Sequence, residues 1–138
     1  QVGRAQIRGS VDRIEVDADG NFYVIDFKTG KNMIKKTEAP DNLQLACYQL
    51  AVALDGFESK LSGTKSTGAE LVYLAKDSVK VTTRQQFVID EAAVKAKIEE
   101  IAEGMGAVTF QAKINEMCEM CVVKAACPIQ NEGRAVIE

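Results

Sequence analysis

The sequence of 138 residues contains no histidine. This absence excludes imidazole metal ligands, Ser-His and Cys-His nucleophile pairs, and histidine general bases. Any chemistry must therefore use carboxylate, lysine, tyrosine or cysteine side chains. The sequence also lacks an apolar run near the roughly 20 residues that span a bilayer, and its N-terminus lacks the charged-then-apolar pattern of a secretory signal. We therefore expect a cytoplasmic protein that has no membrane partner.

Length and charge limit how the chain can be organised. A chain of 138 residues with 46% hydrophobic residues suits one domain around one core. Its net charge of -3 gives no overall attraction to nucleic acid, so contact with DNA would need a local basic surface or another domain. There is no initiator methionine, and strand-like sequence follows almost at once, so we expect a fragment of a longer protein. We expect a single domain over residues 1–138, in which residues 108–138 form a cysteine-bearing tail.

Strand-like sequence fills the N-terminal part of the chain. Residues 7–16 and 22–29 are rich in Val, Ile, Phe and Tyr, and Asp17-Ala18-Asp19-Gly20-Asn21 between them is a hairpin signature. Two antiparallel strands are predicted here. Composition then predicts an exposed loop followed by three strands, at residues 59–68, 70–76, 79–84 and 86–89 respectively.

Capping residues and apolar periodicity predict two helices. The first follows Pro40, with Asp41 as its N-cap and Gly56 at its C-terminal end. The second begins after Asp90 and runs to about Gly104. The apolar stripe of the first helix is predicted at Leu43, Cys47, Leu50 and Leu54. The order of elements predicts an α/β fold, a mixed β-sheet flanked by helices, with an irregular tail that carries cysteines.

Asp26 and Lys28 lie two residues apart in a predicted strand, and residues two apart in a strand share one face. Their side chains should therefore project together, while Phe27 points the other way into the core. Asp12 lies on the partner strand, and its position depends on the turn. A two-residue turn sets Asp12 on the opposite face from Asp26, whereas a three-residue turn with Gly20 in the left-handed conformation sets the two carboxylates directly opposite each other.

Opposed carboxylates on one face would repel each other, and a divalent cation between them would reverse that effect. Mg²⁺ prefers one or two carboxylates together with waters and substrate phosphate. In this hypothesis Asp12 and Asp26 bind Mg²⁺ or Mn²⁺, and Lys28 orients or helps to deprotonate an attacking water. The structural alternative is that the two aspartates are surface charges at the open end of a hairpin and that Lys28 is their counter-ion.

Gln44 and Tyr48 lie four residues apart on the first predicted helix and so share one face. This face is offset from the apolar stripe. Two explanations stay open, because the amide and the phenol could be half-exposed packing residues or could line a cleft beside the acidic pair.

Three segments together resemble the motifs of the PD-(D/E)XK nuclease superfamily in its RecB branch. They are Gly9-Ser10-Val11-Asp12-Arg13, then Ile25-Asp26-Phe27-Lys28-Thr29-Gly30, then Gln44-Leu45-Ala46-Cys47-Tyr48. The resemblance is close over residues 9–48, less close over the tail from 110 to 127, and strongest to the C-terminal nuclease domains of bacterial helicase-nucleases such as RecB, AddB and AdnAB. It implies a restriction-endonuclease-like fold.

This resemblance also implies roles for individual residues. Asp12, Asp26 and the carbonyl of Phe27 would be metal ligands, Lys28 the catalytic lysine, and Gln44 with Tyr48 an accessory pair. The implied activity is metal-dependent hydrolysis of DNA phosphodiester bonds, as an exonuclease in the repair and recombination of double-strand breaks. The implied partners are single-stranded DNA ends, helicase motor domains in the same parent chain, and a partner helicase-nuclease subunit. Many relatives carry a histidine or an acidic residue in a helix before the first strand, and this sequence has nothing there to match it.

The tail contains Cys118, Cys121 and Cys127, a CxxC pair and a third cysteine six residues later. A CxxC pair alone suits redox sites and zinc knuckles as well, while zinc would need a fourth Cys or His ligand. Similar tails among the resembled nucleases bind an iron-sulfur cluster, with a fourth cysteine upstream of the nuclease motifs. We expect that cluster in the longer parent protein. Cys47 lies on the apolar helix stripe, so we expect it to be buried in packing and to bind no metal.

Two functions from different classes remain after this reasoning. The first is a divalent-metal-dependent DNA nuclease domain. The second is a noncatalytic nucleic-acid-binding module organised by a metal-cysteine tail. Cleavage that requires both a divalent metal and Asp26 would separate them.

Overall fold

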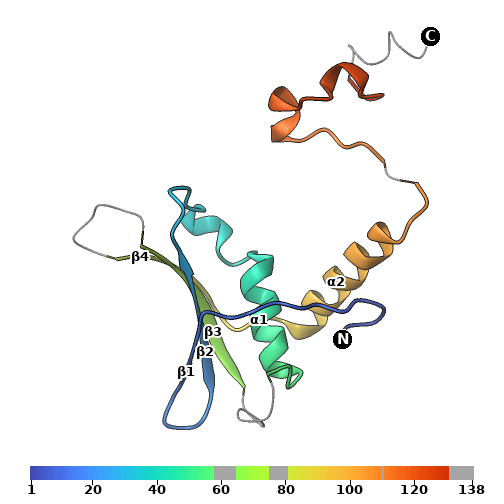
Figure 1. Cartoon of the computed structure of the whole chain (residues 1–138). Coiled ribbons are helices and arrows are strands. Elements are labelled where there is room, and N and C mark those ends of the chain that lie inside the picture. Colours follow the sequence, from blue (N-terminus) through green and yellow to red (C-terminus); the bar gives the residue numbers. More distant parts are fainter. Residues whose placement is uncertain (58–64, 75–80, 110, 131–138) are drawn as a thin grey trace. The chain divides into compact units, whose positions relative to one another are not determined.

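The computed structural model describes residues 1–57, 65–74, 81–109 and 111–130 (Figure 1). Two compact units can be distinguished, Gln1–Ala102 and Glu103–Glu138. The predicted loop at 59–68 and the predicted strands at 70–76 and 79–84 lie partly outside the described residues. Within the described residues, no helix is both long and apolar enough to cross a membrane.

The first unit contains a four-stranded mixed sheet with the order β1-β2-β3-β4. Its strands are β1 (Arg13–Val16), β2 (Phe22–Lys28), β3 (Ser66–Tyr73) and β4 (Thr82–Gln86). β2 and β3 are parallel, and the two outer pairs are antiparallel. Two helices accompany the sheet, α1 (Leu43–Ala53) between β2 and β3 in the chain and α2 (Glu91–Met105) after β4. This mixed sheet flanked by helices confirms the predicted α/β fold class.

The hairpin between β1 and β2 has the three-residue turn. Arg13 pairs with Ile25 and Val16 with Phe22, which is the register that a three-residue turn produces. Gly20 has a φ of 81°, the left-handed conformation that this turn needs. The carboxylate of Asp17 accepts hydrogen bonds from the backbone N–H groups of residues 19 and 21. The bond from the Asn21 backbone is the main cause of a pKa of Asp17 below its usual range.

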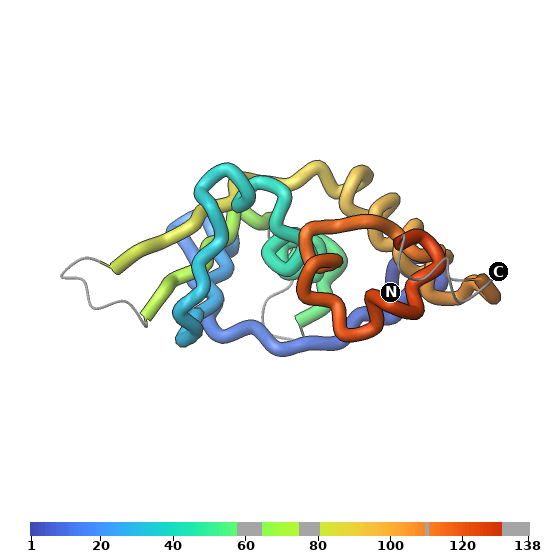
Figure 2. The backbone as a smooth tube through the Cα atoms, turned by 90° about the horizontal axis from the view of Figure 1, so that it is seen from above, coloured from blue at the N-terminus to red at the C-terminus, as the bar shows by residue number. Residues whose placement is uncertain are grey.

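β1 is shorter than the strand predicted at residues 7–16, and its early end has a local cause. Asp12 Oδ2 accepts a hydrogen bond of 2.8 Å from the backbone N–H of Phe27. A side chain thus takes the position that a backbone carbonyl of β1 would otherwise occupy, so the ladder stops at Arg13. Residues before Asp12 continue alongside α1 instead of extending the sheet (Figure 2, blue).

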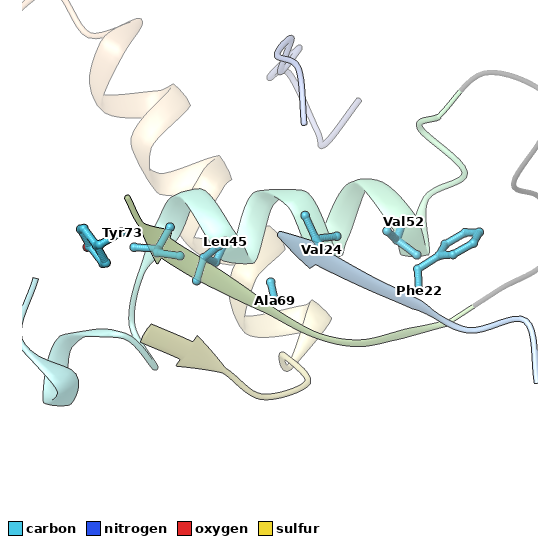
Figure 3. Close-up of a cluster of buried hydrophobic side chains, with 7 residues drawn as sticks. Phe22, Val24, Leu45, Val52, Ala69 and Tyr73 are labelled. Carbon is cyan, nitrogen blue, oxygen red and sulfur yellow. The ribbon is translucent and has the colours of Figure 1, made fainter. Parts of the chain in front are cut away.

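α1 packs on one face of β2 and β3 and forms the main hydrophobic core (Figure 3). The residues of this core are Phe22, Val24, Leu45, Val52, Ala69, Leu71 and Tyr73. Phe22, Val24 and Asp26 alternate along β2, so the face that carries Asp26 is the face that α1 covers. Phe27 lies on the other face and is 37% exposed. The prediction that Phe27 points into the core was therefore wrong, because the core formed on the face of the carboxylate.

Two details of α1 also differ from the prediction. Asn42, rather than Asp41, is the N-cap, and its side chain accepts a hydrogen bond from the N–H of Leu45. The predicted stripe is only partly correct, since Leu50 is buried whereas Leu43 and Leu54 are 38% and 40% exposed. The helix turns Leu45 and its neighbours toward the sheet instead, because β2 and β3 offer a larger apolar surface there.

A bulge shapes the start of β3. Phe22 pairs with Ser66 and Tyr23 with Gly68, so Thr67 is left over in the ladder. Gly68 has a φ of 138°, and a Cβ there would lie 2.8 Å from the carbonyl oxygen of Gln86. Only glycine fits this position, because both the backbone conformation and the close approach of β4 exclude a side chain.

α2 begins as predicted, and the last residues of α2 belong to the second unit. Asp90 Oδ1 accepts hydrogen bonds from the N–H groups of Ala92 and Ala93. Ile98 packs with Leu50 of α1 and with Val2 in a second small core. Beyond α2, the second unit contains two short 3₁₀ helices, η2 (Glu116–Met120) and η3 (Lys124–Ala126).

Candidate active site

β2 and α1 together build a polar cluster at one end of the core. Asp26 and Lys28 share one face of β2, as the sequence predicts, and α1 covers that face. Gln44 and Tyr48 lie one helical turn apart near the start of α1 and face the same point. Asp26 is only 5% exposed. Its burial follows from its position, because it continues the row of Phe22 and Val24 under the helix.

Hydrogen bonds join all four side chains. Asp26 Oδ1 accepts from Gln44 Nε2 at 3.0 Å and from the hydroxyl of Tyr48 at 3.1 Å. Lys28 Nζ donates to Gln44 Oε1 at 2.7 Å. Gln44 therefore bridges the two charges, because its side-chain N–H donates to the carboxylate of Asp26 and its side-chain oxygen accepts from the ammonium of Lys28. Gln44 and Tyr48 both contact the acidic residue Asp26. Of the two explanations that the sequence left open, these contacts favour a position beside the carboxylate over half-exposed packing.

The second carboxylate oxygen of Asp26 has an unusual environment. Oδ2 lies 2.7 Å from Lys28 Nζ in an ion pair. The same atom is buried, and no group in the described residues donates a hydrogen bond to it with acceptable geometry. Charge attraction without a well-directed hydrogen bond leaves this oxygen under-satisfied, and such atoms in native sites call for an explanation.

Tyr48 is half-buried beside this carboxylate. Burial raises the pKa of Tyr48, and the neighbouring negative charge of Asp26 acts in the same direction. The hydroxyl therefore stays protonated at neutral pH and remains a hydrogen-bond donor to Asp26.

Asp12, the residue directly before β1, reaches β2 beside Asp26. It is exposed, and its Oδ2 is bound to the N–H of Phe27, the residue directly after Asp26. The hairpin ladder ends at the pair of Arg13 and Ile25. Its register, continued by one residue, would set Asp12 across from Asp26, but the side chain of Asp12 binds the backbone N–H of Phe27 instead. The predicted direct repulsion is offset in this arrangement, because Lys28 neutralises Asp26 and a backbone N–H meets Asp12.

The carbonyl of Phe27 points to the side of β2 on which β1 and the preceding Asp12 lie. The carbonyl of Lys28 accepts a hydrogen bond from Leu74, on the β3 side. Backbone groups of successive residues in a strand point to alternate sides. The N–H and C=O of Phe27 therefore both face β1, and the carbonyl oxygen lies on the side of Asp12.

Two buried glutamines that the sequence reasoning missed support the start of α1. The Nε2 of Gln86 donates to the carbonyls of Ala39, Pro40 and Asn42, which lead into the helix. Its Oε1 accepts from the fully buried Gln49. A glutamine within the otherwise apolar run from Leu45 to Ala53 is the signal in the sequence that could have pointed to this network.

The comparison with known families adds to this geometry. Residues 1–128 match the family model of the PD-(D/E)XK nuclease superfamily. The chain belongs to this superfamily. No curated protein matches the chain. Membership in the PD-(D/E)XK superfamily makes the chain a nuclease by family, and the superfamily typically uses divalent metals.

Residues of this PD-(D/E)XK chain fit a divalent cation by their chemistry. Asp12, Asp26 and the Phe27 carbonyl are all oxygen donors, the type that Mg²⁺ and Mn²⁺ prefer. The buried, under-satisfied Oδ2 of Asp26 is the observation that favours such a ligand. Two carboxylates suffice for Mg²⁺, which keeps several waters. Across the described part of the chain, no three His, Cys, Asp or Glu side chains gather as a metal cluster.

The cysteines of the tail are arranged by local bonds. The backbone N–H of Asn115 donates to Cys118 Sγ at 3.2 Å, and the N–H of Cys121 donates to the carbonyl of Cys118. Cys121 is exposed, and Cys127 is half-buried. The described residues do not bring the three thiols together as a metal group. This arrangement does not fit an iron-sulfur cluster, which therefore stays a prediction for a longer parent protein.

Cys47 is half-buried in α1 and packs against the second core of Val2, Leu50 and Ile98. Burial raises the pKa of its thiol. A protonated, packed thiol is a poor metal ligand, because metals bind the thiolate. The expected packing role agrees with this environment, although the burial is less complete than predicted.

Proposed function

We propose that this chain is the nuclease domain of a DNA-processing enzyme and that it hydrolyses phosphodiester bonds of DNA with Mg²⁺ or Mn²⁺. The observation that carries the proposal is the buried Asp26–Lys28 pair, which Gln44 and Tyr48 hold in place in a PD-(D/E)XK chain. A structural ion pair would not require a glutamine that bridges both charges and a carboxylate oxygen left without a hydrogen bond.

In this proposal Asp12, Asp26 and the carbonyl of Phe27 would hold the cation. A bound divalent cation supplies Lewis-acid chemistry at a phosphoryl oxygen. The remaining work falls to side chains of the protein.

Lys28 binds the phosphate and orients the attacking water. An ammonium has three N–H donors, and Lys28 uses one of them in its hydrogen bond to Gln44. Its contact with Asp26 is an ion pair without a well-directed hydrogen bond, so an N–H remains to meet a phosphate oxygen or the water. Its side chain is 32% exposed, so the ammonium is reachable from solvent although its partner carboxylate is not. Gln44 fixes the ammonium by accepting from it at 2.7 Å.

The proposal extends to the biological setting that the resemblance implies. The domain would act on single-stranded ends within a helicase-nuclease that repairs double-strand breaks, with motor domains in the same parent chain and a partner subunit. The support for this setting is the likeness of residues 9–48 to the RecB branch of the superfamily.

The test is a cleavage assay on the full chain with single-stranded DNA, duplex DNA and RNA of matched length. We expect cleavage of single-stranded DNA in Mg²⁺ or Mn²⁺, none in EDTA, and none by Asp26→Ala. Asp19→Ala is the matched control, because Asp19 is an exposed aspartate in the turn of the same hairpin. Equal cleavage by wild type and Asp26→Ala would refute the proposal, and metal-independent binding without any cleavage would favour the noncatalytic alternative.

A further inference from the structure

A cavity of about 540 Å³ lies beside the active site, between α1 and the N-terminal stretch that runs along it. One face of α1 and its C-cap Leu54 form the first wall, in which Gln44, Cys47, Tyr48, Ala51 and Leu54 have the spacing of three and four that one helical face shows. Residues 7–9 and Val11, from the stretch that leads to Asp12, lie on the opposite side.

The cavity and the active site share two side chains. Gln44 and Tyr48 line the cavity and also hydrogen-bond to Asp26. A ligand in the cavity would therefore lie against the same phenol that touches the reactive carboxylate. Val11, on the other wall, directly precedes Asp12. The two proposed metal-binding carboxylates do not line the cavity themselves, but each adjoins a residue that does: Asp26 through its bonds to Gln44 and Tyr48, and Asp12 as the neighbour of Val11 in sequence.

The walls are largely apolar and are only partly covered. Ile7 is 51% exposed and Leu54 is 40% exposed, although both line the cavity. Large apolar side chains that are exposed in the wall of a cavity are typical of a binding site. Arg8 adds one cation to the same wall.

We propose that this cavity binds the nucleobase of the nucleotide next to the scissile phosphate. The inference rests on the proposed function, because the phosphate position is taken from Asp26 and Lys28. A base offers a flat, largely apolar face for the ring of Tyr48 and for the aliphatic walls, and the cavity volume lies within the usual range for small-ligand sites. Arg8 is available for the charge of a neighbouring phosphate.

This assignment predicts a preference for single strands. A base can enter a cavity on the protein only when it is unpaired and unstacked. Duplex DNA would have to open first. The site would tolerate all four bases, since stacking and apolar contact do not read hydrogen-bond patterns.

Binding in EDTA tests the inference without any need for catalysis. The probes are a fluorescent thymidine oligonucleotide of about six nucleotides and a fully abasic oligonucleotide of equal length. Ala51→Leu fills the cavity from the wall of α1, and Ala53→Leu adds the same side chain at an exposed position of α1. We expect wild type to bind the thymidine probe more tightly than the abasic probe, by roughly tenfold.

The variants separate base binding from a general loss of structure. Ala51→Leu should lose most of the preference for the thymidine probe and keep wild-type affinity for the abasic probe, whereas Ala53→Leu should match wild type on both. Ile7→Ala, on the opposite wall, should weaken thymidine binding alone and serves if Ala51→Leu does not fold.

Equal affinity of wild type for the two probes would overturn the base site, as would equal weakening of both probes by Ala51→Leu and Ile7→Ala. Cleavage in Mn²⁺ is measured separately on the same proteins. Failure of every variant and of wild type to cleave would refute the proposed function, while a base-dependent affinity in EDTA would still support the cavity as a base-binding site.

Discussion

Asp26 belongs to the predicted catalytic cluster and Cys121 to the predicted cysteine cluster of the tail, yet the surroundings of the two residues differ. Asp26 is 5% exposed and is held by side chains from β2 and α1, which are up to 22 residues apart in sequence. Cys121 is exposed on a chain of short turns, where the described hydrogen bonds join residues close in sequence. Apolar neighbours in the tail are exposed as well, Met120 at 71% and Val122 at 99%.

The comparison shows what prepares a site for chemistry. The carboxylate site is fixed by a sheet register and by a helix that packs on that sheet, so contacts within the protein hold its side chains in place. The cysteine tail has spacing but no packed framework among the described residues. A ligand or a neighbouring part of a longer protein would have to gather its thiols, because local turns alone do not bring them together.

The largest effect is expected at Asp26. Asp26→Asn should lower the rate of DNA cleavage by about 10³-fold, since it removes a charged oxygen at the reacting phosphate. Wild type at about 100 times its dissociation constant for Mn²⁺ should gain roughly 2.7 kcal/mol of stability, a rise of several degrees in Tm. The variant should lose that rise.

The metal-free variant should also be less stable than wild type, by about 1–3 kcal/mol, because Lys28 loses its partner and Tyr48 and Gln44 lose a charged acceptor. Thermal melting with and without Mn²⁺, beside the cleavage assay, measures each of these effects. A Mn²⁺ shift that persists in Asp26→Asn would remove Asp26 from the metal site.

Lys28 should separate cleavage from metal binding. Lys28→Ala should reduce cleavage by roughly 100-fold, because the ammonium orients the water and the phosphate. The Mn²⁺ shift in Tm should persist, since the oxygen donors remain. Lys35→Ala is the matched control, an exposed lysine in the segment between β2 and α1. Full cleavage by Lys28→Ala would exclude this lysine from the mechanism.

A smaller effect is expected at Tyr48, which holds Asp26 from α1. Tyr48→Phe removes the 3.1 Å hydrogen bond to Asp26 and keeps the ring. We expect a loss of about 1 kcal/mol in stability and a several-fold loss in cleavage. The raised pKa of Tyr48 gives a sign for pH: its bond contributes below the usual tyrosine pKa and is lost as pH rises through the higher folded value.

Stability measured against pH in wild type and Tyr48→Phe checks this sign. The stability advantage of wild type should disappear at strongly alkaline pH. An advantage that grows with alkaline pH would contradict the assignment of the hydroxyl as a donor.

The smallest effect is expected for the reactivity of two thiols, Cys47 in α1 and Cys121 in the tail. Cys47 should react with iodoacetamide more slowly than Cys121, because burial raises the pKa of Cys47 and restricts access to it, whereas Cys121 is exposed. Mass spectrometry of the alkylated peptides measures the order. Cys121→Ser should leave the cleavage rate within about twofold of wild type, since surface substitutions away from packed features change little. Preferential alkylation of Cys47 would contradict the packing described for α1.

Much of the site follows from short-range rules. The periodicity of a strand places Asp26 and Lys28 on one face of β2. The periodicity of a helix places Gln44 and Tyr48 on one face of α1. The turn residues 18–20, with a glycine at the left-handed position, determine the hairpin register up to Arg13, next to Asp12. These rules concern neighbours in sequence, where backbone geometry leaves few choices.

The sequence by itself therefore determined the first two strands, the two α-helices, the hairpin register and the residue types of the site, whereas the strand predicted at 86–89 was wrong because β4 ends at Gln86. Tertiary structure alone decided which face of β2 became the core, and hence that Asp26 is buried and Phe27 is 37% exposed. It also decided that Gln44 bridges Asp26 and Lys28 and that Gln86 supports the start of α1. The physical reason is that burial depends on which apolar surfaces pack against each other. This packing joins segments far apart in the chain, and the periodicity of a single strand or helix does not specify which segments these are.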